Sequence, residues 1–278
     1  MHNMKYPLYQ IDAFTSRLFG GNPAAVVLLD QWLKDDALQA IAAENNLPET
    51  AFVVPREDMA LLRWFTPTVE VDLCGHATLA AAHVLFAYQY PTLKKVNFST
   101  RSGVIAVSRE GDELSLDFPA CPGTSIEVSD TLALALGGKP SEAYIARYLL
   151  ALFDTETAIQ TLCPDFGLIA ALDAFAVIVS APGNTVDFVS RFFAPRAGIP
   201  EDPVTGSAHC TLVPYWAARL GKTRLTARQL SLRGGELDCE LRGDRVAITG
   251  RTVEYLRGEI NVPDSSLRES YSTEADCR

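Results

Sequence analysis

Arg63-Trp64-Phe65-Thr66-Pro67 returns 128 residues later as Arg191-Phe192-Phe193-Ala194-Pro195, and this repeat decides the fold of the 278-residue chain. The likeness continues beyond it, because Cys74 lies seven positions after the first copy ends and Asp202 lies seven positions after the second. Internal self-similarity at a fixed offset is typical of a duplicated unit. We therefore expect two related halves.

Each copy leads into an apolar helix. Residues 76–87 carry few polar side chains, and residues 206–220 are largely apolar and end at Gly221. A helix without a polar face is normally enclosed by protein on all sides. We therefore expect both helices to be buried, one at the centre of each half.

Strand-like segments surround these helices in both parts of the sequence. A further helix is expected at residues 35–46, stopped by Asn46 and Pro48, and another near residues 155–162. The expected strands are 8–14, 24–29, 50–54, 61–65, 96–99, 103–109, 113–118, 143–153, 173–179, 229–232, 236–241, 245–249 and 253–256. We divide the chain into an N-terminal half, 1–125, a C-terminal half, 126–263, and a polar tail, 264–278.

Composition narrows the classes of function. The chain is 48% hydrophobic and contains no run of 18 apolar residues, so it can bury a large core and a membrane span is not expected. A net charge of −10 argues against a nucleic-acid-binding protein, which usually presents a basic face. The N-terminus shows no apolar secretory segment, so a cytoplasmic location is expected.

The six cysteines form no CxxC pair, which indicates reduced thiols rather than a disulfide framework. Cys74 and His76 could begin a metal site, but no second group of ligands completes it in the sequence. We expect no metal.

The starts of the two apolar helices are the first candidates for a site. Each start brings a glycine and small polar residues to backbone N–H groups that lack intrahelical partners, and such groups bind anions. Two of them, related by the repeat, would face each other and could hold a substrate carboxylate. The alternative is plain N-capping by a hydroxyl residue, for which the candidates are Thr78, Thr205 and Ser207.

Four side chains could carry the chemistry. Glu49 lies between a helix stop and an apolar strand, where a carboxyl group can both take and return a proton, although it could also be a solvated turn residue. His76 is a second proton carrier or a cap partner, and Asp202 is an acid or a group that orients His76 or a substrate amine. Cys74 is a thiol base at a helix start or a small buried hydrophobe.

Taken together, these residues resemble the PhzF-like (phenazine biosynthesis) family of isomerases. The match follows the family's order from the start of the chain to about residue 260. Its four segments are Gly21-Asn22-Pro23-Ala24-Ala25-Val26, Asn46-Leu47-Pro48-Glu49-Thr50-Ala51-Phe52, Arg63-Trp64-Phe65-Thr66-Pro67 with Leu73-Cys74-Gly75-His76-Ala77-Thr78, and Glu201-Asp202-Pro203-Val204-Thr205-Gly206-Ser207-Ala208-His209.

The resemblance implies the α+β fold of the diaminopimelate-epimerase-like superfamily, with two pseudo-symmetric halves, each a curled sheet or barrel around a central helix. It also implies a cofactor-independent isomerase, a homodimer and a small carboxylated metabolite as substrate. The family's catalytic residues fall on Glu49, His76 and Asp202. Its substrate-binding residues fall on Asn22, Cys74, Gly75, Gly206 and Ser207.

Two other functions stay open. Related epimerases use one cysteine from each half, and here Cys74 stands at the first such place but Asp202 at the second, which disfavours a two-thiol amino-acid racemase or epimerase. A catalytically silent small-molecule-binding protein on the same scaffold is the third hypothesis. Residues 121–180 match the family in pattern more than in residues, so the resemblance implies no particular substrate.

Overall fold

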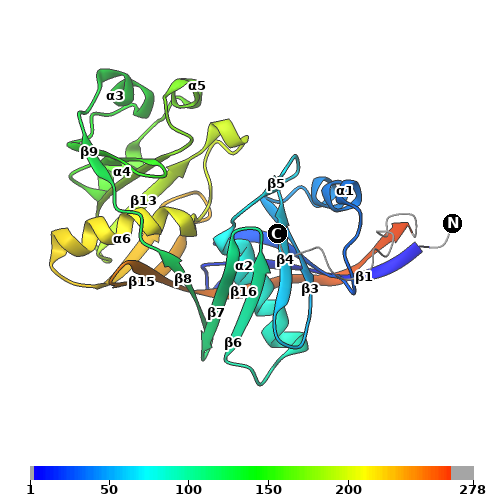
Figure 1. The fold of residues 1–278 in the computed structure, drawn as a ribbon. Helices are drawn as coiled ribbons and strands as arrows, with labels where there is room; N and C mark the ends of the chain where they lie inside the picture. Colours follow the sequence, from blue (N-terminus) through cyan, green and yellow to red (C-terminus); the bar gives the residue numbers. More distant parts are fainter. Residues whose placement is uncertain (1–2, 264–278) are drawn as a thin grey trace.

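The strands of the protein form one continuous sheet that runs through both halves of the chain (Figure 1). The computed structural model describes residues 3–263, and the predicted polar tail, 264–278, lies outside the described residues. Among residues 3–263, no helix is long and apolar enough to cross a membrane.

In the first half the sheet closes into a barrel. Its strands pair in the order β1, β2, β3, β4, β6, β7, β8 and β16, and β16 pairs back with β1. A short strand, β5 (Glu70–Val71), pairs with β4 outside this ring. The bounds are β1 (Asn3–Ala13), β2 (Asn22–Leu28), β3 (Glu49–Val54), β4 (Ala60–Phe65), β6 (Lys95–Thr100), β7 (Gly103–Glu110), β8 (Glu113–Pro119) and β16 (Arg245–Pro263).

The second half repeats this plan as a curled sheet. From β10 to β16 the successive pairings are antiparallel, parallel, antiparallel, parallel, antiparallel and antiparallel, the same order as from β1 to β8. This agreement supports the duplication expected from the sequence. The bounds are β9 (Thr124–Ile126), β10 (Glu142–Ile145), β11 (Leu149–Leu152), β12 (Val177–Pro182), β13 (Phe188–Phe193), β14 (Arg224–Gln229) and β15 (Gly235–Arg242).

The two halves exchange strands at their ends. After β8, the chain crosses over and β9 pairs with β10 of the second half. After residue 251, β16 leaves the second half and its residues 252–263 pair with β1. The division at residue 125 stays a prediction. The pairings show that each half contains a strand segment whose neighbours in the sequence belong to the other half, β9 in the second half and residues 252–263 in the first.

The repeated Arg-aromatic-Phe motif has the same structural role in both halves. Arg63 makes two hydrogen bonds of 2.7 Å to the carboxylate of Glu70, and its guanidinium lies 5.1 Å from the ring centroid of Phe65. Arg191 bonds Glu201 at 2.7 and 2.9 Å and lies 5.0 Å from the ring of Phe193. Because a planar guanidinium can bind a carboxylate at two points while stacking on an aromatic ring, lysine could not replace either arginine.

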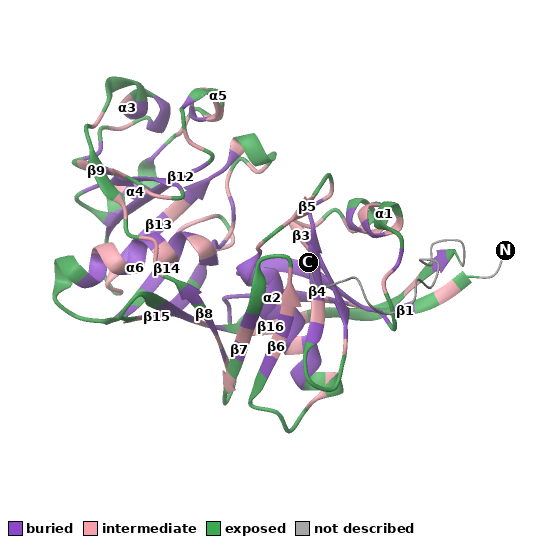
Figure 2. Ribbon diagram, in the orientation of Figure 1, coloured by how far each residue is buried: buried purple, intermediate pink, exposed green. Residues whose placement is uncertain are grey.

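One central helix packs inside each sheet, as predicted. Every residue of α2 (Gly75–Val84) except His83 is buried, and the helix contacts strands on several sides of the barrel. It continues as a π-helical turn, Leu85–Gln89. The second central helix, α6 (Gly206–Leu220), packs on β14, β15 and β16, but its last turn, residues 218–220, is exposed, so the prediction of nearly complete burial holds only for α2 (Figure 2).

The remaining helices cover the outer faces of the sheets. The first of them lies over β2 and β3, where Asn46 in the left-handed conformation ends it as the sequence predicted. The other three pack on the outer side of β11, β12 and β13. Their bounds are α1 (Asp35–Asn45), α3 (Asp130–Leu136), α4 (Glu156–Thr161) and α5 (Phe166–Ala171), with a 3-10 turn at Pro195–Ala197.

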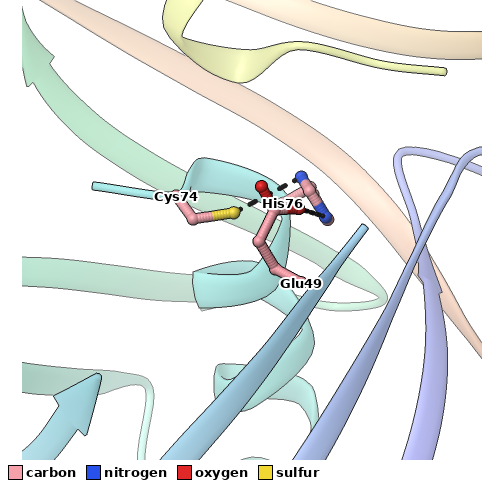
Figure 3. Close-up of side chains that lie close together, drawn as sticks. All are labelled: Glu49, Cys74 and His76. Atoms are coloured by element: carbon pink, nitrogen blue, oxygen red, sulfur yellow. Dashed lines mark hydrogen bonds and ion pairs between the residues drawn. The ribbon is translucent and has the colours of Figure 1, made fainter. Parts of the chain in front are cut away.

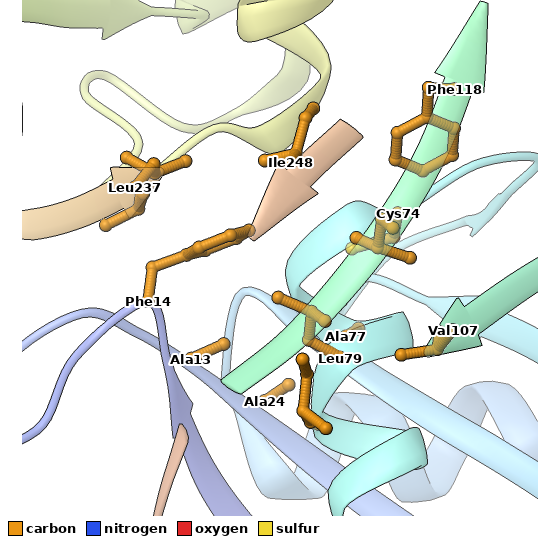
Figure 4. Close-up of a cluster of buried hydrophobic side chains, with 14 of the residues drawn as sticks. Ala13, Phe14, Ala24, Cys74, Ala77, Leu79, Val107, Phe118, Leu237 and Ile248 are labelled. Carbon is orange, nitrogen blue, oxygen red and sulfur yellow. The ribbon is translucent and has the colours of Figure 1, made fainter. Parts of the chain in front are cut away.

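A single apolar core joins the two halves, and Phe14 lies at the junction (Figure 4). Its ring is fully buried between Leu237 and Ile248 of the second half and the alanines of β1, β2 and α2. The backbone of Phe14 has a φ of 61°, which is rare for a bulky residue, and its carbonyl accepts a hydrogen bond from the N–H of Glu236. This packing holds the starts of the two central helices against each other.

Candidate active site

The starts of α2 and α6 meet at two glycines. A Cβ built on Gly75 would lie 3.7 Å from the Cα of Gly206, and one built on Gly206 would lie 3.8 Å from the Cα of Gly75. Both distances are ordinary van der Waals contacts, so the two helix starts pack against each other at these glycines. The corresponding residues just before each helix are Cys74 and Thr205, so the partner of Cys74 in the repeat is Thr205 and not Asp202 as the sequence spacing suggested.

A cavity of about 410 Å³ opens beside this meeting point, a size typical of small-molecule sites. It is lined by residues of both halves. Seven of the eight predicted site residues line it, namely Glu49, Cys74, Gly75, His76, Asp202, Gly206 and Ser207.

Glu49 and His76 form a close pair in the cavity wall (Figure 3). Glu49 begins β3, His76 lies in the first turn of α2, and Glu49 Oε2 is 3.1 Å from His76 Nε2. Neither atom has another hydrogen-bond partner among the described residues. Burial disfavours the imidazolium, whereas the contacts of the ring with Cys74 and Glu49 favour it, and the pKa of His76 lies well above its usual value.

Cys74 faces the other nitrogen of the same ring, with Sγ 3.5 Å from His76 Nδ1. Burial, together with the charge of Glu49, raises the pKa of Cys74 to about 11. The side chain is therefore a neutral thiol at neutral pH, and Glu49 is the anion that favours protonation of His76 there. A thiol in this state is a poor base.

Asn22 lies behind the cavity and not in its wall, which differs from its prediction as a substrate-binding residue. It is fully buried, and its Nδ2 donates to Asp202 Oδ1 at 2.8 Å and to the carbonyl of Val204 at 2.9 Å. The same nitrogen is 3.2 Å from His76 Nδ1. Asn22 therefore connects the catalytic candidates of the two halves.

Asp202 is held on both oxygens. Asn22 donates to one, and the hydroxyl of Thr205 donates to the other in a short hydrogen bond. Gln229 fixes the same loop through the carbonyl of Asp202 at 2.8 Å and the N–H of Thr205 at 2.9 Å. Burial raises the pKa of Asp202 to about 6, although the charge of His76 acts in the opposite direction.

The N-capping alternative does not account for the helix starts. Neither Cys74 nor Thr205 makes a side-chain cap hydrogen bond, because the Thr205 hydroxyl is engaged by Asp202. By contrast, Ser129, Thr155 and Asp165 cap α3, α4 and α5. Thr78 donates to the carbonyl of Cys74, a bond within the helix, and Ser207 Oγ lies 3.1 Å from Tyr148 Oη.

Sequence reasoning missed one wall of the cavity, which Arg147, Tyr148, Phe175 and Phe192 provide. Residues 143–153 were expected to form a single strand. They form instead the hairpin of β10 and β11, whose turn presents Arg147 and Tyr148 to the site. Ala146-Arg147-Tyr148 contains none of the usual turn residues, so no local signal marked the break.

The ligand atoms of Glu49, Cys74 and His76 lie within 4.8 Å of one another, a grouping that could hold a metal ion. The sequence alone did not show that Glu49 joins the other two. However, the imidazole stands between its partners, with Nδ1 toward Cys74 and Nε2 toward Glu49 (Figure 3). Since one nitrogen cannot ligate an ion on both sides of the ring, this arrangement suits proton transfer better than metal binding, and the absence of a metal stays a prediction.

The chain is similar to known proteins over most of its length. Residues 11–258 match the family model described as phenazine biosynthesis-like protein (PhzC-PhzF). An uncharacterized isomerase of Pseudomonas aeruginosa is 51% identical over 260 residues, which cover 93% of this chain and 100% of the relative.

Solved structures give the same result for the fold. A PhzF-family protein of Enterococcus faecalis superposes with a TM-score of 0.91 at 47% identity, covering 92% of this chain and 99% of that one. A hydroxyproline epimerase of Agrobacterium vitis, solved with bound trans-4-hydroxy-L-proline, superposes with a TM-score of 0.61 at 13% identity, covering 94% and 92%. The second likeness shows the fold alone. Together they confirm the predicted α+β fold.

Proposed function

This chain belongs to the phenazine biosynthesis-like (PhzC-PhzF) family, and from that premise we propose a cofactor-independent isomerase that moves a hydrogen within a small carboxylated substrate. The prediction of an isomerase is confirmed by close relatives that carry that name. The observation that carries the finer proposal is the Glu49–His76 contact in the wall of a cavity where two helix starts meet.

Glu49 is the proposed proton carrier. The carboxyl group of Glu49, 3.1 Å from His76 in the cavity wall, removes a proton from a carbon of the substrate. The electron pair of the broken C–H bond enters a double bond conjugated with the substrate carboxylate, and the original double bond shifts. Glu49 then returns the proton to a different carbon. The carbon skeleton is neither oxidised nor reduced, so the step needs no redox partner.

The substrate carboxylate is proposed to bind at the start of α6. Thr205 leaves the first N–H groups of this helix without a side-chain cap, and Gly206 and Ser207 line the cavity there. An anion satisfies such groups and is favoured by the positive end of the helix dipole. The Ser207 hydroxyl, oriented by Tyr148, adds a further donor.

The alternatives are weaker on structural grounds. A two-thiol racemase would need a second cysteine where Thr205 stands, and Cys74 is a neutral thiol. A silent binding protein would have no use for an acid–base pair in the wall of its cavity. The homodimer stays a prediction.

The proposal is tested by incubating cyclic dienoic acids and amino acids with the protein in deuterated water, followed by NMR. We expect movement of a double bond in an unsaturated acid. A racemase would exchange the α-hydrogen of an amino acid instead, and a binding protein would do neither.

Glu49→Gln keeps the shape of the side chain but removes the proton carrier. We expect turnover to fall by about 10²-fold or more, while calorimetry finds carboxylate binding preserved. Glu57→Gln is the matched control because Glu57 is an exposed residue beyond β3. If Glu49→Gln retained most of the activity, Glu49 would have no part in the mechanism.

A further inference from the structure

Arg147 is the cationic side chain of the cavity that has no polar partner. Of the residues that line the cavity, only His76 and Arg147 can be positively charged, and His76 is paired with Glu49. Nearby Arg63 and Arg101 are both bound to Glu70. Within residues 3–263, the exposed Arg147 guanidinium makes neither an ion pair nor a hydrogen bond, and it lies over the ring of Tyr148, 5.6 Å from the centroid.

Arg147 and the proposed carboxylate site stand on either side of one tyrosine. The ring of Tyr148 carries the guanidinium over its face, while its hydroxyl reaches Ser207 Oγ at 3.1 Å. Tyr148 therefore separates the two anion-binding groups, one over its ring face and one at its hydroxyl. A ligand that contacts both must carry its two charged groups several bonds apart.

The wall between these groups is aromatic. Phe192 packs edge-on against Tyr148 at 5.0 Å between centroids, and Phe175 lies 6.5 Å from it with the rings tilted by 30°. Phe175 is 56% exposed although it is large and apolar. Exposed aromatic rings in a cavity favour a flat apolar ligand body.

We propose that Arg147 forms a second anion subsite at the cavity rim, and that the substrate is a small planar acid bearing a second carboxylate. The inference rests on the proposed function, since it takes the first carboxylate to bind at the start of α6. It also answers an electrostatic problem. The chain has a net charge of −10, and Asp72 is exposed on the same cavity wall, so an approaching dianion is repelled unless a local cation attracts it.

Calorimetry with benzoate and isophthalate at low salt tests this proposal on the whole protein. Isophthalate adds one carboxylate to the same ring. We expect it to bind about tenfold more tightly, which corresponds to about 1.4 kcal/mol, and we expect added KCl to reduce the difference. In Arg147→Met the preference should vanish while benzoate affinity stays unchanged, and Arg147→Lys should restore part of it.

Arg257→Met is the matched control. Arg257 is also an exposed arginine over a tyrosine ring, 4.4 Å from the centroid of Tyr88, but it lies outside the cavity. It should leave both affinities as they are. Equal binding of the two ligands by the unmodified protein would overturn the second subsite alone, whereas failure of both ligands to bind would overturn the carboxylate site of the proposed function as well. The subsite would also be overturned if Arg147→Met and Asp72→Asn each weakened the binding of benzoate and of isophthalate by the same factor. Arg147 would then act through a salt bridge with Asp72 across the cavity and not through the second carboxylate.

Discussion

Two buried histidines near the starts of the central helices have opposite chemistry. His76 contacts Glu49 and its pKa is raised, whereas burial lowers the pKa of His209 to about 4. His209 Nδ1 instead lies 2.9 Å from the carbonyl of Thr205, which suits a neutral structural ring. Each histidine follows a helix-start glycine in sequence, so residue type and position alone could not separate them. The difference comes from β3, which brings Glu49 to one helix start only.

Asn22 shows the same limit of sequence reasoning. The family resemblance marked it as a substrate-binding residue, but the local sequence could not show that its amide reaches Asp202, 180 positions away. Glu49 was found because it stands between a helix stop and a buried strand, a pattern that the structure retains.

Cys74→Ala tests whether the thiol has a chemical role. Since the pKa of Cys74 is about 11 and the equivalent residue of the other half is Thr205, we expect the variant to retain substantial activity. Steady-state kinetics beside a thermal melt measures this. Complete inactivation of a well-folded variant would revive a thiol-based racemase.

Asp202→Asn tests the buried acid. The folded pKa of about 6 lies above the usual 3.8, so the folded protein binds a proton more tightly than the unfolded chain. The stability from this group is complete below about pH 4 and is lost as the pH rises through about 6. The loss is about 3 kcal/mol at most, at 1.36 kcal/mol per pKa unit.

The asparagine variant should therefore melt at a higher temperature than the unmodified protein at pH 7.5, though not at pH 4, and lose activity at both. Melting curves across this range give the answer. Identical pH dependence of the two proteins would show that Asp202 does not take up its proton on folding.

At the scale of elements, the central helices were predictable and the wall of the site was not. Apolar composition all round identified α2, and Gly221 marked the end of α6, where it adopts the left-handed conformation. The β10–β11 hairpin was read as one strand because both arms are apolar and no turn residue divides them. Conversely, residues 245–249 and 253–256 were read as two strands, although β16 is continuous through Gly250.

Gly250 carries the next prediction, because β16 passes directly against Phe14 there. A Cβ on Gly250 would lie 2.5 Å from Phe14 Cδ1, and the ring cannot move away since it is fully buried. Gly250→Ala should cost about 1–3 kcal/mol of folding free energy through overpacking. Urea denaturation measures the cost.

Gly258→Ala is the control on the same strand, because its Cβ would meet only Leu256, at 4.0 Å. If the two variants had equal stability, the ring of Phe14 would be free to move, and it would not hold the two halves in a fixed arrangement.

At the scale of the whole molecule, the sequence predicted a duplication but not the exchange of strands. The Arg-aromatic-Phe repeat is a local signal, because a short stretch of sequence in each half is enough to recognise it. The pairing of β1 with residues 252–263 is not local, since it joins the two ends of the described chain. Neither strand carries a motif that predicts which strand it pairs with. The exchange of strands therefore has a specific consequence for how the first half folds.

The first barrel should fold by itself only when β16 is supplied. Residues 3–119 alone would leave β1 and β8 as unpaired edges, which lack the hydrogen bonds that β16 provides on both sides. In the protein, Asn3 lies opposite Pro263, so a two-residue Asn-Gly turn can connect residues 245–263 to residue 3 as a hairpin. We expect this fused chain, 245–263 followed by 3–119, to unfold cooperatively by circular dichroism, although below the melting temperature of the full chain because the core around Phe14 is cut. The unfused fragment 3–119 should show no cooperative transition. Cooperative unfolding of that fragment would mean that the barrel does not depend on its closing strand, and that the exchange of strands is not required for the first half to fold.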